Sequence, residues 1–350
     1  MVLKFLFLQN FRNYKQAEFS FSDKMNLIVG PNAIGKTNLL EAIFLLSIGK
    51  SFRAERDDQM IRFGESVGRV GGKVRVEVHE EDTRLEVVIN SGGGVRQKRF
   101  SVNGVSRRRN VFAGMLRTVV FLPTDLEIVI GQPGQRRRFL DDVLEQVDAD
   151  YALALSTYVK ALRQRNALLE RVLATGVRDE KNFAYWDELL IGNGKVVAKK
   201  REEFISFINR RGKEFFGFTV VYDRSEISSA RLEKYRQAEM GAGVTLVGPH
   251  RDEVLIMNGD VQVKSFASRG QQRLVVLEMR LAQIAYIEER TGERPLLLLD
   301  DIFSELDEEH VKQVIQTLPG YQCVITTTHE EFGLFRGDEN VIELKKYAGI

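Results

Sequence analysis

Eight residues at 30–37, GPNAIGKT, have the spacing G-x-x-x-x-G-K-[ST]. They separate the apolar segment MNLIVG, which has the pattern of a buried strand, from KTNLLEAIFLLSIG, whose apolar residues have helical spacing. In that context the N–H groups of the loop and of the helix N-terminus cradle phosphates, Lys36 reaches the β and γ groups, and the Thr37 hydroxyl binds Mg²⁺. The predicted nucleotide-binding residues are Gly30, Pro31, Asn32, Ala33, Ile34, Gly35, Lys36, Thr37 and Asn38.

Two adjacent carboxylates, Asp300 and Asp301, follow four leucines in the stretch LLLLDD at 296–301. A strand that apolar belongs inside a sheet, and like charges at its end repel unless something cationic lies beside them. The phosphate loop supplies that partner. We expect Asp300 to hold Mg²⁺, directly or through a water, and Asp301 to orient the attacking water. The alternative is that both aspartates cap a turn.

The segment FASRGQQR at 266–273 opens a long helical pattern and looks like the signature sequence of ABC-type ATPases. In such signatures a serine hydroxyl, a glycine N–H and the helix N-terminus contact a γ-phosphate. In the ABC arrangement Ser268 cannot reach Lys36 of its own chain, so we expect an ATP-dependent homodimer with two composite sites. A simple helix cap is the other interpretation of this serine. The predicted signature residues are Ser268, Arg269, Gly270 and Gln271.

The periodicity along the chain predicts a split domain. Strand patterns around one helix fill the first ninety residues, helical patterns interrupted by glycines at 176, 192 and 194 run from about 134 to 215, and strand patterns return after 244. A helix is expected at about 308–317, before the strand CVITTT. We therefore predict an α/β ATPase lobe built from residues 1–122 and 291–350. A mostly helical second lobe, residues 123–290, carries the signature and has no long coiled coil.

Composition excludes several classes of protein. The 350 residues are 43% apolar with a net charge of +2, so DNA would be bound through local patches rather than by overall charge. One cysteine, Cys323, in an apolar run, is expected to be a structural thiol and allows no disulfide scaffold. The apolar start lacks a signal-peptide cleavage region, and no run approaches a membrane span, so a cytoplasmic protein is expected.

Basic clusters are the candidate DNA contacts, although each also fits a solvated face. Without a recognisable base-reading motif, recognition of backbone and shape with strong salt dependence is expected. Two clusters are predicted to contact DNA, and two more are further candidates. The predicted pair is Arg136, Arg137 and Arg138 with Lys199, Lys200 and Arg201, and the others are Arg107, Arg108 and Arg109 with Arg210, Arg211 and Lys213.

Motifs along nearly the whole chain resemble the RecF family, in the SMC and Rad50 branch of ABC-type ATPases. They are LQNFRNY at 8–14, GPNAIGKTNLLEAI at 30–43, GKSFR at 49–53, FLPTDLEIVIGQPGQRRRFLD at 121–141, VGPHRDE at 247–253, FASRGQQR and LLLLDDIFSELD. The resemblance implies that Arg12 and Asn13 lie near the nucleotide, that Ser304 and Asp307 of the SELD loop cross a dimer interface, and that His329 senses the γ-phosphate.

The resemblance also has implications for the rate of ATP hydrolysis and for the loop that joins the two lobes. An aspartate, Asp301, stands where the wider ABC pattern has a glutamate, and its shorter side chain predicts slow hydrolysis. Gln132 is a candidate for the glutamine of the lobe-joining loop. The resemblance places GPHRDE in the signature lobe, where His250, Arg251 and Asp252 also fit a buried polar network.

The function implied by the resemblance is that of a recombination mediator. Such a protein dimerises on ATP, binds gapped duplex DNA near single-strand junctions, works with RecR and RecO, and helps load RecA in the cytoplasm, near the nucleoid. Hydrolysis would be weak, DNA-stimulated and used as a release switch. An SMC-like DNA-bridging ATPase is the alternative, which the missing coiled coil disfavours. A transporter ATPase subunit and a small-molecule kinase fit less well, because the helical insert separates loop and signature and because a kinase has no use for FASRGQQR.

Overall fold

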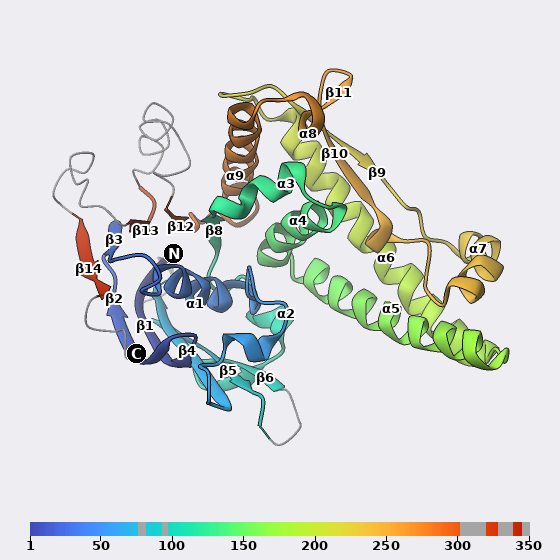
Figure 1. The fold of residues 1–350 in the computed structure, drawn as a ribbon, viewed down its shortest axis with the longest axis horizontal. Helices are drawn as coiled ribbons and strands as arrows, with labels where there is room; N and C mark the ends of the chain where they lie inside the picture. The colour runs from blue at the N-terminus through green and yellow to red at the C-terminus, as the bar shows by residue number, and fades with distance from the viewer. Residues whose placement is uncertain (76–81, 93–96, 302–319, 328–338, 345–350) are drawn as a thin grey trace. The chain divides into compact units, whose positions relative to one another are not determined.

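A computed structural model describes residues 1–75, 82–92, 97–301, 320–327 and 339–344 (Figure 1). The chain divides into two compact units. The first combines Met1–Asp125 with Gln283–Ile350, and the second is Leu126–Ala282. The long helix α9, Arg269–Thr291, crosses the second boundary. No helix among the described residues is long and apolar enough to cross a membrane.

A five-stranded parallel sheet lies in the first unit, in the order β14-β3-β13-β12-β8. Strand β3 pairs with two strands from the far end of the chain, β13 and β14. The predicted α/β lobe assembled from both termini is therefore confirmed. Because both faces of such a sheet are covered, its inner strands are nearly continuous apolar runs, whereas the edge strand β14 alternates partly buried and exposed residues. The strands are β3 (Met25–Val29), β8 (Thr118–Phe121), β12 (Leu296–Asp300), β13 (Cys323–Thr327) and β14 (Asn340–Glu343).

A second, antiparallel sheet of the same unit has the order β2-β1-β4-β5-β6-β7. Its strands alternate buried and exposed residues, as expected for a sheet with one solvated face. They are β1 (Val2–Phe11), β2 (Tyr14–Ser20), β4 (Val67–Arg75), β5 (Thr83–Asn90), β6 (Gln97–Val102) and β7 (Val105–Arg107). Two short helices join this sheet to the rest, η1 (Asp57–Met60) before β4 and α2 (Arg109–Phe112) after β7, and a third, η2 (Pro123–Leu126), follows β8.

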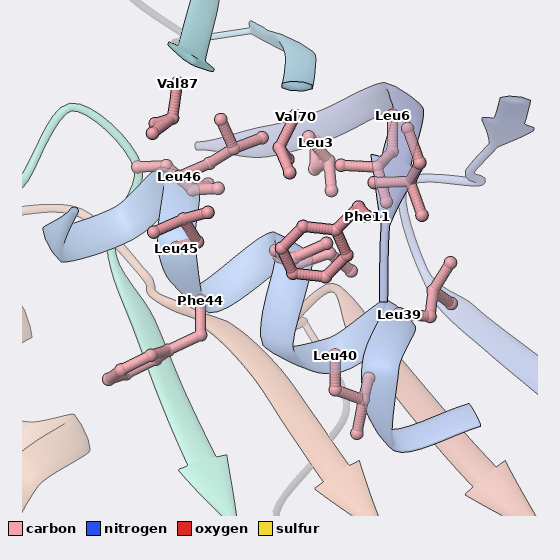
Figure 2. Packing of buried hydrophobic residues seen from close by; sticks show 14 of the residues in the cluster. Leu3, Leu6, Phe11, Leu39, Leu40, Phe44, Leu45, Leu46, Val70 and Val87 are labelled. Atoms are coloured by element: carbon pink, nitrogen blue, oxygen red, sulfur yellow. The ribbon is translucent and has the colours of Figure 1, made fainter. Parts of the chain in front are cut away.

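Helix α1, Lys36–Ile48, contacts strands of both sheets. Figure 2 shows its leucines and Phe44 packed among Leu3, Leu6, Phe11, Val70 and Val87. Almost every residue of this helix is buried and most are apolar, so burial is not confined to one face. Each fully buried leucine contributes about 1.5–3 kcal/mol of burial free energy. The phosphate loop is thus attached to an element that has little freedom to move.

The second unit is mostly helical, and Figure 1 shows α5 and α6 packed along each other. A three-stranded antiparallel sheet, β11-β10-β9, completes it, with β9 against α6. The helices are α3 (Glu127–Ile130), α4 (Pro133–Val147), α5 (Ala149–Thr175), α6 (Glu180–Arg210), α7 (Ser229–Ala242), η3 (Pro249–Arg251) and α8 (Val263–Phe266), and the strands are β9 (Thr219–Asp223), β10 (Glu253–Asn258) and β11 (Val261–Gln262).

Of the three glycines predicted to interrupt the helical region, one does so and two do not. Gly176 ends α5 in the left-handed conformation, at φ +71°. Gly192 and Gly194 do not interrupt a helix, because both lie inside α6. A Cβ on Gly194 would lie 2.9 Å from a methyl carbon of Ile227 and 3.0 Å from the Tyr158 ring. The glycine therefore permits close packing within a continuous helix, at a cost of about 1 kcal/mol of helix propensity.

Candidate nucleotide site

The phosphate loop connects β3 to α1 and has a backbone shape that few residues tolerate. Ala33, at φ +64°, and Gly35, at φ +115°, are both in the left-handed region. Gly35 is the N-cap residue of α1 and has no side chain to cap the first N–H groups. These groups have no acceptor within the helix, so they are donors for an anion.

Lys36 is 8% exposed, and its ammonium lies over the loop. The Nζ atom donates to the carbonyl oxygens of Gly30 at 2.6 Å and Pro31 at 3.1 Å. Burial lowers the pKa of this ammonium, and the charges of Asp301 and Asp300 oppose that shift. A cation held against carbonyls beside a cradle of N–H groups fits a phosphate ligand.

Asp300 and Thr37 are brought together as the sequence predicts. The Thr37 hydroxyl donates to Oδ2 of Asp300 at 2.8 Å, and the Thr326 hydroxyl donates to Oδ1 at 2.7 Å. Asp300 is the last residue of β12, Thr326 lies in the neighbouring strand β13, and Thr37 is the second residue of α1. A hydroxyl and a carboxylate side by side are hard oxygen ligands that fit Mg²⁺. The sequence analysis did not predict a role for Thr326, although this residue lies in the predicted strand CVITTT.

Asp301 follows at a sharp change of backbone direction. Its φ of +48° is in the left-handed region, which is uncommon for a residue other than glycine, and its N–H donates to the Thr326 hydroxyl at 3.0 Å. Strained backbone of this kind persists where the surroundings over-determine it, often at functional sites. Two threonine hydroxyls therefore stabilise the Asp300 carboxylate, and the Lys36 charge attracts both carboxylates.

Asn13 contacts the phosphate loop directly. Its Nδ2 donates to the Ile34 carbonyl at 2.7 Å, and its Oδ1 accepts from Nδ2 of Asn38 at 2.6 Å. The neighbouring Tyr14 hydroxyl donates to the Gly35 carbonyl at 3.0 Å. Arg12 lies at φ +54° in the turn before β2, and its guanidinium binds Glu41 of α1 and the Gln59 carbonyl.

Three residues of this region were not predicted as site residues: Glu41, Ser51 and Arg53. The Ser51 hydroxyl and Nε of Arg53 donate to the Glu41 carboxylate, and Arg53 also donates to Oδ1 of Asn38. Burial opposes ionisation of Glu41, but the hydrogen bonds of Arg12 and Ser51 and the charges of Arg53 and Arg12 hold its pKa below the usual range. The signal available in the sequence was the motif GKSFR at 49–53.

The signature residues Ser268, Arg269, Gly270 and Gln271 belong to the second unit and are exposed. The Gln271 N–H donates to the Ser268 hydroxyl at 3.3 Å, and the Ser268 N–H donates to Oε1 of Gln271 at 2.9 Å. This reciprocal pair is a capping box at the start of α9. Within a single chain, Ser268 is therefore a helix cap, as the alternative interpretation predicted. The contact with a partner's phosphate stays a prediction.

The prediction of DNA contact is wrong for two residues of the basic clusters. Arg136 and Arg201 are 4% and 3% exposed, so their guanidinium groups have no surface for DNA. Arg136 pairs with Glu253, and Arg201 pairs with Asp141 and Asp252. A buried charge requires such partners, because desolvation without pairing is costly.

The other members of these clusters differ in availability. Arg137 donates to the Asp252 carbonyl, and Arg138 pairs with Asp142 at 3.7 Å. Lys200 pairs with Asp148 at 2.8 Å, whereas Lys199 is exposed.

The segment GPHRDE forms a buried polar network inside the second unit. Asp252 is fully buried; it accepts from Arg201, from the Ser225 N–H and from the Tyr222 hydroxyl. A ring nitrogen of His250 lies 2.6 Å from the Tyr158 hydroxyl, and Arg251 donates to the Thr245 carbonyl. The buried-network interpretation is confirmed for Asp252, whereas His250 is half-buried and Arg251 is exposed.

The described residues do not test the remaining predictions. Ser304, Asp307 and His329, and the helix expected at 308–317, lie outside the described residues. Gln132 is exposed at the N-cap of α4, and its assignment to a lobe-joining loop stays a prediction.

Comparison with known proteins agrees with this geometry. The family model described as RecF/RecN/SMC N terminal domain matches residues 2–347. The DNA replication and repair protein RecF of Shouchella clausii (strain KSM-K16) is 37% identical, over 94% of this chain and 93% of that protein. RecF of Bacillus velezensis is 38% identical, over 94% and 93% of the two chains.

Solved structures give the same result. The recombination mediator protein RecF-ATP in the RecFOR pathway is similar with a TM-score of 0.87 and 31% identity, covering 100% of this chain and 96% of that one. Its counterpart RecF-ATPrS has a TM-score of 0.84 and 33% identity, covering 94% and 92%. The chain belongs to the RecF/RecN/SMC family and, within it, to the RecF proteins.

Proposed function

We propose that this chain is an ATP-dependent, DNA-binding recombination mediator. The observation that carries the proposal is the hydrogen bond of 2.8 Å from the Thr37 hydroxyl to Oδ2 of Asp300, beside the Lys36 ammonium. Two RecF relatives in the RecFOR pathway have structures named for ATP and for ATPrS, which supports ATP as the nucleotide. Family membership supports three expectations: that the chain binds ATP, that it works with RecR and RecO, and that it helps load RecA.

Each site residue has a proposed role in ATP binding and hydrolysis. Lys36 and the N–H groups of the loop bind the phosphates, and Thr37 and Asp300 hold Mg²⁺. The metal, when bound, neutralises phosphate charge. Asp301 accepts a hydrogen bond from the attacking water and orients it. Because the aspartate is shorter than the glutamate of the wider ABC pattern, we expect a weak, DNA-stimulated ATPase that acts as a switch.

The signature completes the site in trans under this proposal. Ser268 of one copy contacts the γ-phosphate bound to the other copy, so ATP joins two chains and hydrolysis releases them. Residues 1–122 and 291–350 then form the ATPase lobe, and 123–290 the signature lobe. The dimer binds gapped duplex DNA near single-strand junctions, and the nucleoid-associated cytoplasm is the expected location.

An SMC-like DNA-bridging ATPase is the second candidate, and helix length disfavours it. The longest described helices, α5 and α6, have 27 and 31 residues. At 1.5 Å per residue each spans only about 40–47 Å. That reach is comparable to the width of a domain, so it does not support bridging of distant DNA segments.

Sedimentation velocity tests the proposal. The purified chain is run with Mg-ATP, with Mg-ADP and without nucleotide, each with and without a labelled gapped duplex. We expect a dimer only with Mg-ATP, and DNA that sediments with it. The matched variant Lys36→Arg should stay monomeric under all conditions. A wild-type chain that stays monomeric with Mg-ATP on DNA, or a variant that dimerises as tightly as the wild type, contradicts the proposal.

A further inference from the structure

Glu41 is a fully buried carboxylate one turn along α1 from the residues that bind phosphate. Its Oε1 accepts from Nη2 of Arg12 at 2.6 Å and from the Ser51 hydroxyl at 2.5 Å. Its Oε2 accepts from Nε of Arg12 at 2.7 Å and from Nε of Arg53 at 3.1 Å. Both oxygens are therefore occupied by the protein. Any influence of Glu41 on a nucleotide must act through the groups that it holds.

One of those groups, Arg53, leads to the phosphate loop. Its Nη2 donates to Oδ1 of Asn38, whose Nδ2 donates to Oδ1 of Asn13 at 2.6 Å. Nδ2 of Asn13 then donates to the Ile34 carbonyl at 2.7 Å. Each amide is oriented by the previous contact, because the end that accepts must be the oxygen, which leaves the NH₂ group at the other end as the donor. The chain of hydrogen bonds thus runs from Glu41 to the loop without a gap.

The other group, Arg12, fixes the same asparagine from the backbone side. Arg12 precedes Asn13 in the turn between β1 and β2, with φ +54°. Its Nη1 donates to the Gln59 carbonyl at 2.6 Å, and its backbone N–H donates to the Met60 carbonyl at 2.8 Å. The bidentate contact with Glu41 therefore anchors the turn to α1.

The loop needs such support, since it is strained. A Cβ on Gly35 would lie 2.7 Å from Nδ2 of Asn13, so the asparagine packs directly on the loop backbone. Ala33 is in the left-handed conformation, which a residue other than glycine keeps only where its neighbours over-determine it. A loop that is already in its binding conformation loses less entropy when a ligand binds.

We infer that Glu41 is a positioning residue of the nucleotide site, which holds Arg12 and Arg53 so that Asn13 and Asn38 keep the phosphate loop in its binding conformation. The inference rests on the proposed function, because it concerns the affinity of the same site. It assigns to Glu41 an effect on nucleotide affinity in addition to any effect on folding.

The test measures binding of a fluorescent ATP analogue with Mg²⁺ to Glu41→Gln, together with its melting temperature. Glutamine keeps the size but offers one acceptor oxygen, and its NH₂ group faces an arginine. We expect affinity to fall about 10- to 100-fold, the range for removal of a partner that orients a ligating group. The matched control is Glu239→Gln, in the second unit, where an equally buried carboxylate accepts from Arg165 at 2.6 Å. It should lower the melting temperature and leave affinity within about twofold.

A double-mutant cycle locates the effect. Because Glu41 acts through Asn13, Glu41→Gln in an Asn13→Ala background should cost much less affinity than in the wild type. Should Glu41→Gln fail to fold, Ser51→Ala removes one of the four contacts and should weaken binding in the same direction by a smaller factor. Nucleotide affinity equal to wild type in the folded variant overturns the inference. A wild-type chain that does not bind Mg-ATP would instead contradict the proposed function.

Discussion

At the scale of single residues, the site shows how a buried strand can end in two adjacent acids. Each oxygen of Asp300 accepts from a threonine hydroxyl, and Asp301 turns away with its N–H on Thr326. The Lys36 ammonium is close enough for both carboxylates to raise its pKa against the effect of burial. Charge, hydroxyl donors and backbone direction together stabilise an arrangement that would otherwise be repulsive.

Asp300→Asn should separate metal binding from phosphate binding. The asparagine can still accept from Thr326, so we expect the fold to be kept, but it lacks the charge that attracts Mg²⁺. Affinity for ATP should fall about 10- to 100-fold with Mg²⁺ present and change little with EDTA. Equilibrium titration of the same ATP analogue under both conditions measures this. Equal losses with and without Mg²⁺ would show that Asp300 does not serve the metal.

At the scale of elements, helices and strands were predicted best where the sequence has a clear helical spacing or a continuous apolar run. The helix after the phosphate loop, the leucine strand and the long helix that FASRGQQR opens correspond to α1, β12 and α9. Apolar runs and a glycine loop leave few alternatives for such segments. Predictions were poorer where tertiary contacts override local preference. Packing on Tyr158 and Ile227 requires a glycine at 194 inside α6. Gly192 also lies within α6, although no such contact requires a glycine there.

The candidate site divides in the same way. Lys36, Thr37 and Asp300 were predictable because a motif fixes their spacing and their chemistry. Glu41, Ser51 and Arg53 were not, because the bonds between them join a helix to a loop ten or more residues away. Arg136 and Arg201 show the converse, since a run of basic letters does not reveal that one member of each run is buried against a carboxylate.

The start of α9 allows the two roles of Ser268 to be separated. Aspartate accepts from backbone N–H groups as well as serine does, so Ser268→Asp should keep the cap, with unfolding free energy within about 0.5 kcal/mol of wild type. Its negative charge would repel a partner's γ-phosphate, and ATP-dependent dimers should be lost. Ser268→Ala loses the cap, at about 1 kcal/mol. Chemical denaturation and sedimentation velocity measure the two effects, and an Asp variant that dimerises normally would leave Ser268 only its capping role.

At the scale of the whole molecule, the charges indicate what kind of DNA contact to expect. The net charge is only +2, so binding depends on exposed cations that are not already paired within the fold. Lys199 and Lys200 are neighbours on α6 that differ in this respect. Lys200 pairs with Asp148 at 2.8 Å, and Lys199 is exposed without an ion-pair partner among the residues that the structure describes.

This pair gives a matched test of DNA contact. If Lys199 neutralises a phosphate, Lys199→Gln should reduce the slope of log affinity against log salt by about 0.9 and leave the melting temperature unchanged. Lys200→Gln should change the slope less, because its ammonium already has a carboxylate partner. Binding of a labelled gapped duplex across a salt series, with Mg-ATP present, measures both slopes. An unchanged slope for Lys199→Gln would remove this face of α6 from the DNA interface and direct the search to the basic residues at 107–109 and 210–213.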